Sequence, residues 1–202
     1  MRLFSYIVVQ DTGFSPNPFW GYCTLANCKP AIRRTAKKGD WIVGLSPKSK
    51  GNKIIYVMEV QKILTYADYF YAKRFQNKKP DYTKNKIVFK CGDNIYEPLH
   101  NGKYRQLKSL HYNLKENKED VSKKEQDLDG KYVLISKNYY YFGSNAIGLP
   151  NGFNELKVGR GHKNKFPEEL VIKFISFISG KKKGRNAHPA KWPDNSWKTA
   201  CR

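Results

Sequence analysis

The stretch KKGDWIVGLSPKSKGNKIIYVMEVQKILTYADYF (residues 37–70) decides the fold. Two of its segments, Asp40–Leu45 and Lys53–Ile63, are rich in β-branched and aromatic residues and predict strands. The polar segment Ser46–Asn52 contains Gly51 and predicts the turn between them. Two strands joined by a turn are therefore expected over residues 40–63.

Helices are expected around this pair of strands. Thr65 has the residue type of an N-cap and precedes the amphipathic, aromatic segment Tyr66–Gln76. Lys29–Lys38 begins with a proline in its first turn and ends at Gly39, which favours a short basic helix. Phe166–Ile178, acidic in its first turn, predicts the closing helix.

Further strands are expected over five segments: Arg2–Gln10, Ile87–Cys91, Tyr132–Ser136, Tyr139–Phe142 and Leu156–Val158. Lys137-Asn138 would be the turn of a hairpin. Because the strands do not alternate regularly with helices, a parallel doubly wound sheet is disfavoured. We predict an α+β protein, built as a small, mostly antiparallel, partly closed β-barrel with about three peripheral helices.

Residues 1–180 are expected to form this single domain, with Lys108–Gly130 as an exposed, highly charged insertion. Residues 181–202 form a basic extension that carries Trp192 and Trp197. This extension could be a nucleic-acid arm or a docked segment. We favour docking, because two tryptophans rarely stay solvated.

The charge of the chain indicates an anionic partner. Lysine and arginine number 38 against 17 acidic residues, which gives a net charge of +21. A bias towards lysine codons would raise acidic residues too, yet these are scarce. An excess of this size repels itself unless something anionic neutralises it. Nucleic acid fits better than a membrane, because the sequence has no amphipathic basic helix and no lipidation motif.

The sequence shows no secretory or membrane-spanning segment, since the apolar N-terminus is short and Lys173 interrupts the best apolar run. We therefore expect a cytoplasmic protein. Its four cysteines are expected to be reduced thiols: Cys23, Cys28, Cys91 and Cys201. Cys23 and Cys28 could supply half of a zinc site, but the four histidines are scattered, so neither a metal nor a cofactor is expected.

Three motifs carry a family resemblance. They are the segment MRLFSYIVVQDTGFSPNPFWGYCTLANCKPAIRRTAKKGDWIVG (residues 1–44), GDNIY (Gly92–Tyr96) and GRGHK (Gly159–Lys163). In this order they resemble the nucleotide-modification-associated domain, second type, a family of bacteria and phages linked to DNA-base modification systems. Gly39-Asp40 and the order of elements also resemble the PUA-like superfamily, particularly its EVE and ASCH branches.

The resemblance to PUA-like readers implies a base pocket formed by the aromatic loop and the start of the following helix. It points to Trp20, Tyr22, Asn27 and Lys29. The rings of this loop could stack a flipped base. Alternatively they cap an open end of the barrel, and Trp41, which lies on a strand, is expected in the core.

Basic side chains supply candidate phosphate contacts. Arg33 and Arg34 lie on the short basic helix and are two of only eight arginines, whose forked donors suit phosphate or guanine. Arg160 and Lys163 flank His162 in a segment whose two glycines let the backbone approach a ligand. A solvated helix and an ordinary turn are the alternatives.

Gly92-Asp93-Asn94 is typical of a turn, and only the resemblance makes Asn94 or Asp93 a candidate for a base edge. The favoured hypothesis is a non-catalytic protein that recognises a modified or flipped base, in DNA rather than RNA, within base modification or phage defence. The rival is an enzyme acting on nucleic acid or nucleotides, such as a base-modifying enzyme, glycosylase or nuclease, for which His162, Asp93 and Cys23 are the candidate groups. A third hypothesis, a structural RNA-binding or ribosome-associated protein, needs only the charge.

Overall fold

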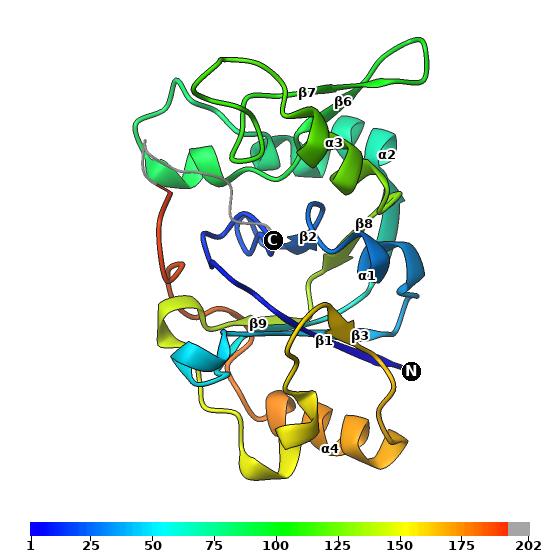
Figure 1. Ribbon diagram of the computed structural model, residues 1–202, viewed down its shortest axis with the longest axis vertical. Coiled ribbons are helices and arrows are strands. Elements are labelled where there is room, and N and C mark those ends of the chain that lie inside the picture. The colour runs from blue at the N-terminus through cyan, green and yellow to red at the C-terminus, as the bar shows by residue number, and fades with distance from the viewer. Residues whose placement is uncertain (194–202) are drawn as a thin grey trace.

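The computed structural model describes residues 1–193, in which a six-stranded and a three-stranded sheet lie face to face (Figure 1). The larger sheet has six strands in the order β10 (His162–Lys163), β1 (Leu3–Ile7), β3 (Trp41–Leu45), β4 (Ile54–Glu59), β9 (Tyr139–Tyr141) and β11 (Gly184–Arg185). The smaller sheet has the order β2 (Cys23–Leu25), β8 (Tyr132–Ser136) and β5 (Lys62–Thr65). A separate pair joins β6 (Tyr96–Pro98) to β7 (Tyr104–Gln106).

The α-helices of the described part are α1 (Pro30–Thr35), α2 (Tyr66–Tyr71), α3 (Val121–Leu128) and α4 (Glu168–Ser179). Short 3-10 helices cover Lys48–Lys50, Lys73–Lys78, Ile87–Cys91, Gly143–Asn145 and Asn151–Leu156. None of these helices is long and apolar enough to span a membrane.

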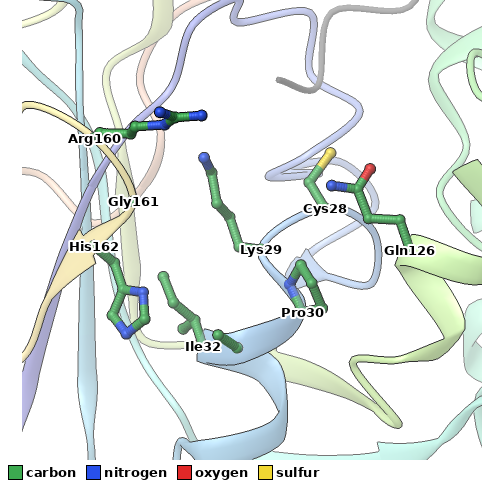
Figure 2. A pocket seen from close by; sticks show the side chains of 9 residues that line it. Cys28, Lys29, Pro30, Ile32, Gln126, Arg160, Gly161 and His162 are labelled. Atoms are coloured by element: carbon green, nitrogen blue, oxygen red, sulfur yellow. The ribbon is translucent and has the colours of Figure 1, made fainter.

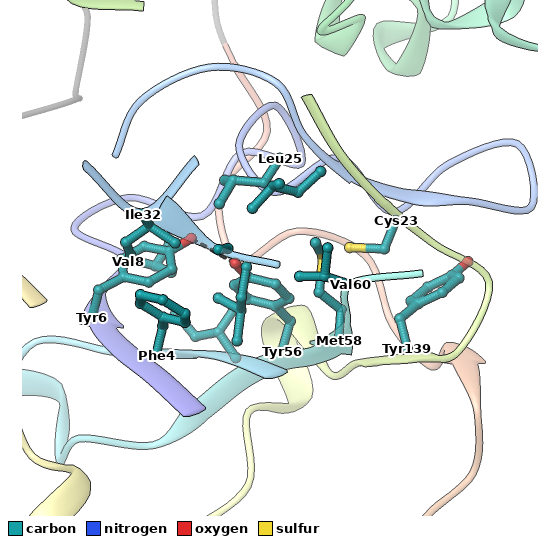
Figure 3. Close-up of a cluster of buried hydrophobic side chains, with 14 of the residues drawn as sticks. Phe4, Tyr6, Val8, Cys23, Leu25, Ile32, Tyr56, Met58, Val60 and Tyr139 are labelled. Atoms are coloured by element: carbon teal, nitrogen blue, oxygen red, sulfur yellow. Dashed lines mark hydrogen bonds between the residues drawn. The ribbon is translucent and has the colours of Figure 1, made fainter. Parts of the chain in front are cut away.

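The central core lies between the two sheets. On β1, Phe4 and Tyr6 point into this core, while Leu3 packs in the cluster on the opposite face with α4. This alternation follows from the two-residue period of a strand. Figure 3 shows Leu25 and Cys23 facing the same core from the smaller sheet. Both faces of the larger sheet are covered at its centre, which explains why β1, β3, β4 and β9 are largely apolar and buried.

One antiparallel ribbon runs through both sheets. Met58 of β4 pairs with Tyr139 of β9, and four residues further along, Lys62 of β5 pairs with Ile135 of β8, four residues before Tyr139. The register is thus unchanged where the ribbon passes from one sheet to the other, and Gln61 N donates to Ile135 O at the crossing. The single strand predicted over residues 53–63 is therefore divided between two sheets.

The hairpin predicted around Lys137-Asn138 does not form. Strands β8 and β9 form as predicted, but β8 pairs with β2 and β5, whereas β9 pairs with β4 and β11. β8 and β9 are consecutive segments of the same side of the ribbon, and they do not pair with one another. The chain bends at Lys137-Asn138 because β4 and β5 make the same bend beside it.

The prediction of an α+β protein is confirmed. Six of the eight strand pairings are antiparallel, although β1 lies parallel to β3. The larger sheet has β10 at one edge and β11 at the other, so the described strands form no closed barrel. Thr65 caps α2 as predicted, its hydroxyl accepting from Asp68 N.

Two predicted strands are wrong. Ile87–Cys91 is a 3-10 helix and pairs with none of the described strands. Its apolar residues pack on other side chains: the centre of the Phe89 ring lies 6.4 Å from that of Trp20. Leu156 ends another 3-10 helix, and its carbonyl accepts from the Ser5 hydroxyl. The strand of this region forms later, at β10.

The segment 108–130 is not a freely exposed insertion. His111 is 1% exposed and Asp127, on α3, is 0% exposed, so this charged segment contributes to the interior. The C-terminal segment is docked as far as the described residues extend: Trp192 stacks on Phe19 at 5.9 Å and 11°, and Lys191 N donates to Asp11 O. Trp197 and Cys201 lie outside the described residues.

Candidate functional site

A pocket of about 300 Å³ lies between the start of α1 and the loop that leads into β10. It is lined by Cys28, Lys29, Pro30, Ala31, Ile32, Gln126, Arg160, Gly161 and His162, none of which is acidic. Figure 2 shows Lys29 between the Arg160–His162 side and the Cys28 and Gln126 side. The pocket thus combines three segments that are far apart in the sequence.

Lys29 stands at the N-cap of α1 in a left-handed conformation, with φ 44° and ψ 52°. Its ammonium lies 5.1 Å from the centre of the Tyr6 ring, a cation–π contact. Burial lowers the pKa of Lys29 below its ordinary value. Among residues 1–193, no ion pair involves Lys29 or Arg160. A half-buried cation without a carboxylate beside it is a suitable partner for an anion.

His162 forms the opposite wall, because β10 pairs with β1 and sets His162 across from Tyr6. Its ring lies 6.1 Å from the ring of Phe4. Burial, and then the charge of Lys29, lower the pKa of His162. Gly161, with φ 76°, adopts a conformation that side chains disfavour, and so lets Arg160 and His162 flank a tight turn. Lys163 lies outside the lining, and its ammonium is 3.4 Å from Glu155 O.

Arg33 does not face the pocket, and its burial is incompatible with a phosphate contact. It is 0% exposed, and its guanidinium donates to oxygens of four residues: Cys28 O, Tyr66 Oη, Asp127 O and Tyr132 O. Arg34, on the exposed side of α1, pairs with Asp129 at 2.5 Å. The predicted basic face of this helix is therefore divided between the interior and an ion pair.

The Gly92-Asp93-Asn94 turn is part of the interior. The Asp93 carboxylate accepts from Thr24 Oγ1 at 2.5 Å and Tyr69 Oη at 2.7 Å, and burial raises its pKa. Asn94 donates to the carbonyls of Tyr69 and Phe75. Asn27, also buried, donates to Asp93 O. These polar side chains hold the fold together and line no part of the pocket.

The acid, base and nucleophile suggested for an enzyme are not assembled. Cys23 is a free, fully buried thiol, and burial raises its pKa. It lies in the core between the sheets, and neither Cys23 nor Asp93 lines the pocket with His162. A thiol held in its protonated form is a poor nucleophile.

The aromatic loop packs on the body of the protein. Trp20 is half-buried beside Phe19, at 5.5 Å, and Tyr22 lies 5.1 Å from the ring of Phe75. Neither residue lines the pocket, so the expected pairing of these rings with the phosphate contacts does not occur. Trp41 belongs to the core as expected, at 6% exposure.

Sequence reasoning missed a cluster at the pocket wall, in which Cys28 of the lining contacts His111 and Asp127 behind it. Cys28 Sγ lies 3.6 Å from His111 Nε2, and His111 Nδ1 lies 2.6 Å from Asp127 Oδ2. Cys28 is disulfide-bonded, which contradicts the prediction of a reduced thiol at this position. Because the three are 83 and 16 residues apart, no local spacing reveals them.

These features define a small α+β domain with a cationic pocket between the start of α1 and the loop that leads into β10. A sequence model of the family described as nucleotide modification associated domain 2 matches residues 1–196. The chain belongs to this family. Comparison with curated proteins and with solved structures gave no match.

Proposed function

We propose that this protein binds nucleic acid, with a phosphate held in the pocket by Lys29 and Arg160, in the setting of base modification. The observation that carries this proposal is the half-buried Lys29 ammonium, which shares an acid-free pocket with Arg160. Phosphate is the anion that nucleic acid presents most regularly, and arginine binds it through two parallel donors.

The size of the pocket supports a single nucleotide unit as the ligand. A volume of about 300 Å³ is at the lower end of the range for ligand sites. A base could enter such a pocket only after it has flipped out of the base stack of the duplex, as happens in proteins that act on or recognise single bases. DNA is the favoured partner and recognition of a modified base the favoured activity, in a cytoplasmic protein of the PUA-like type. The net charge of +21 would strengthen binding along the flanking backbone.

A titration of matched oligonucleotides tests this proposal. Fluorescently labelled plain and base-modified DNA and RNA would be bound at two salt concentrations, followed by mass spectrometry of the recovered oligonucleotide. A reader leaves the mass unchanged and prefers one modified oligonucleotide. We expect Lys29→Ala to weaken binding by about tenfold and to reduce the salt slope by about one.

Lys37→Ala is the matched control, because Lys37 is an exposed lysine that follows α1 and lies outside the pocket. It should change the affinity less than about twofold, as an exposed lysine that makes only diffuse contacts would. Equal effects of Lys29→Ala and Lys37→Ala would contradict the proposed pocket, and would leave only general electrostatic binding.

A further inference from the structure

In the contact chain Cys28–His111–Asp127, the sulfur of a disulfide-bonded cysteine lies beside an imidazole that a carboxylate holds from its other side. Reduction of the disulfide would turn this chain into a thiol, a base and an orienting carboxylate. The sulfur-to-nitrogen distance of 3.6 Å is within hydrogen-bond range for sulfur, and the 2.6 Å contact fixes the imidazole from its other side. His111 and Asp127 are 1% and 0% exposed, and Cys28, at 5% exposure, is the member of the chain that lines the pocket. The reactive end of the chain therefore faces the ligand site.

A cation site explains this arrangement less well. The possible ligand atoms lie within 4.8 Å of one another. However, the sulfur lies beside Nε2 and the carboxylate beside Nδ1, on opposite sides of one imidazole ring. A cation bound between Sγ and Nε2 would leave Asp127 behind the ring as an outer partner. The geometry favours a proton relay over a three-ligand centre.

Asp127 is held in place by contacts that suit an ionised carboxylate. Its oxygens accept from Cys28 N at 2.6 Å and Tyr96 Oη at 2.7 Å, in addition to His111. Burial alone would raise the pKa of Asp127, but its interactions with His111 and Arg33, together with the Tyr96 hydrogen bond, hold it below its usual value. An ionised Asp127 favours the imidazolium that forms when His111 takes a proton.

We propose that Cys28, once its disulfide is reduced, is an activated nucleophile on the wall of the pocket, with His111 as its base and Asp127 as a positioning residue. This inference rests on the proposed function for its substrate class, an electrophile carried by a phosphate-bearing nucleotide. A dithiol reductant would supply the two electrons and two protons that convert the disulfide to two thiols, and would itself become a disulfide.

The chemical step is a proton transfer followed by attack. His111 Nε2 takes the proton from Cys28 Sγ, which leaves a thiolate next to an imidazolium. The thiolate electron pair then forms a bond to an electrophilic carbon. With iodoacetamide as the probe, the S–C bond forms, the C–I bond breaks, and iodide leaves with its electron pair.

Alkylation of the full chain tests the proposal, and the protein supplies its own controls. After reduction with dithiothreitol and desalting, the protein would react with iodoacetamide between pH 5 and 9, with peptide mass spectrometry at each cysteine. Cys23 and Cys91 are 0% exposed and, unlike Cys28, do not line the pocket; burial raises the pKa of Cys91 to about 12. They stay unlabelled as long as the protein is folded, so they report the folding of every variant.

We expect Cys28 to react at pH 7 about tenfold faster than an ordinary thiol, whose pKa is about 8.5. His111→Ala should remove this advantage and move the midpoint of the pH profile upwards, while His100→Ala, at an exposed turn, should leave it unchanged. Asp127→Asn should shift the midpoint in the same direction as His111→Ala. An ordinary rate at Cys28 that is the same in His111→Ala, or no labelling at Cys28 in the folded and reduced protein, would overturn the proposal.

A nucleotide-protection arm separates this inference from the proposed function. A deoxynucleoside monophosphate should slow the alkylation of Cys28 in the native protein and should not do so in Lys29→Ala. Rapid, His111-dependent alkylation without any protection would support the activated thiol and contradict the nucleotide pocket. Protection of a Cys28 that reacts at an ordinary rate would support the pocket and contradict the activated thiol.

Discussion

Lys29 and Arg33 are four residues apart on one segment, yet the fold uses their charges in opposite ways. Arg33 is completely buried and donates to four oxygens of the protein. Lys29 is half-buried, faces the pocket, and has no ion pair among the described residues. The hydrogen-bonding groups of Arg33 are satisfied by the protein itself, whereas the Lys29 ammonium is available to a ligand.

This difference shows that charge on a helix face does not define a binding surface. A buried cation contributes to stability only while its partners are present, and its removal leaves their oxygens without donors. A cation beside a pocket contributes little to stability and much to the affinity for an anion. The two classes can therefore be separated by measuring stability and binding on the same variants.

The largest expected effect is on stability, at Arg33. Arg33→Ala should lower the free energy of unfolding by about 3–5 kcal/mol, because it removes a buried charge whose partners cannot reach water. Arg34→Ala, its neighbour in an exposed ion pair, should cost about 1 kcal/mol or less. Urea unfolding measures both, and equal losses would show that Arg33 is not the interior support described here.

The next effect is at Gly130, which packs against the Arg33 guanidinium. A Cβ at this position would overlap the guanidinium, which four hydrogen bonds hold in place. Gly130→Ala should cost about 1–3 kcal/mol through overpacking. Gly148→Ala meets no atom within 4 Å and is the control. In the Arg33→Ala background the cost of Gly130→Ala should shrink, because the two residues are in contact.

A third test concerns Lys78, an interior ammonium that donates to Asn17, Tyr22 and Thr24. Burial lowers its pKa to about 8. Between about pH 8 and 10.4 the unfolded chain binds more protons than the folded one, so this group makes the unfolding free energy rise with pH. Lys78→Met should remove a slope of up to about 1.4 kcal/mol per pH unit, measured by urea unfolding across this range.

The control for Lys78 is Lys86→Met, at an exposed lysine nearby in the sequence. The slope should be the same in this variant as in the parent protein. An unchanged slope in Lys78→Met would mean that the pKa of Lys78 is not lowered in the folded protein. The contrast between a buried lysine bound by protein oxygens and the pocket lysine Lys29 would then be lost.

The smallest effect is electrostatic and lies within the pocket. The charge of Lys29 contributes to the lowered pKa of His162, so Lys29→Ala should raise that pKa. An NMR titration of the imidazole signals measures the shift, and Lys37→Ala should not produce it. If the pKa of His162 does not move, Lys29 and His162 do not share one pocket in solution.

Local sequence patterns were sufficient for much of the fold. The Asp40–Leu45 strand, the Thr65 cap and the closing helix depend on neighbouring residues and were predicted to within a few positions. The division of residues 53–63 between two sheets was not predictable, because the bend carries no glycine or proline and keeps its hydrogen bonds. The register of the whole ribbon decides where that bend falls.

The candidate site was predictable in part. Lys29, Arg160 and His162 were named from the sequence, and they line one pocket. The roles of Arg33 and Asp127 could not be predicted, because Arg33 depends on carbonyls 94 and 99 residues away along the chain. The charged composition of residues 108–130 indicated an exposed segment, whereas long-range packing buries His111 and Asp127.

The continuous ribbon has a consequence for how a ligand enters. One wall of the pocket follows β2 of the smaller sheet, and the other belongs to β10 of the larger sheet. Because hydrogen-bonded strands pass from one sheet into the other, the two sheets cannot move apart as separate rigid bodies. The walls are set in position before any ligand arrives. Ligand binding should therefore cost little free energy for ordering the protein, and selectivity should arise from the shape of the preformed pocket.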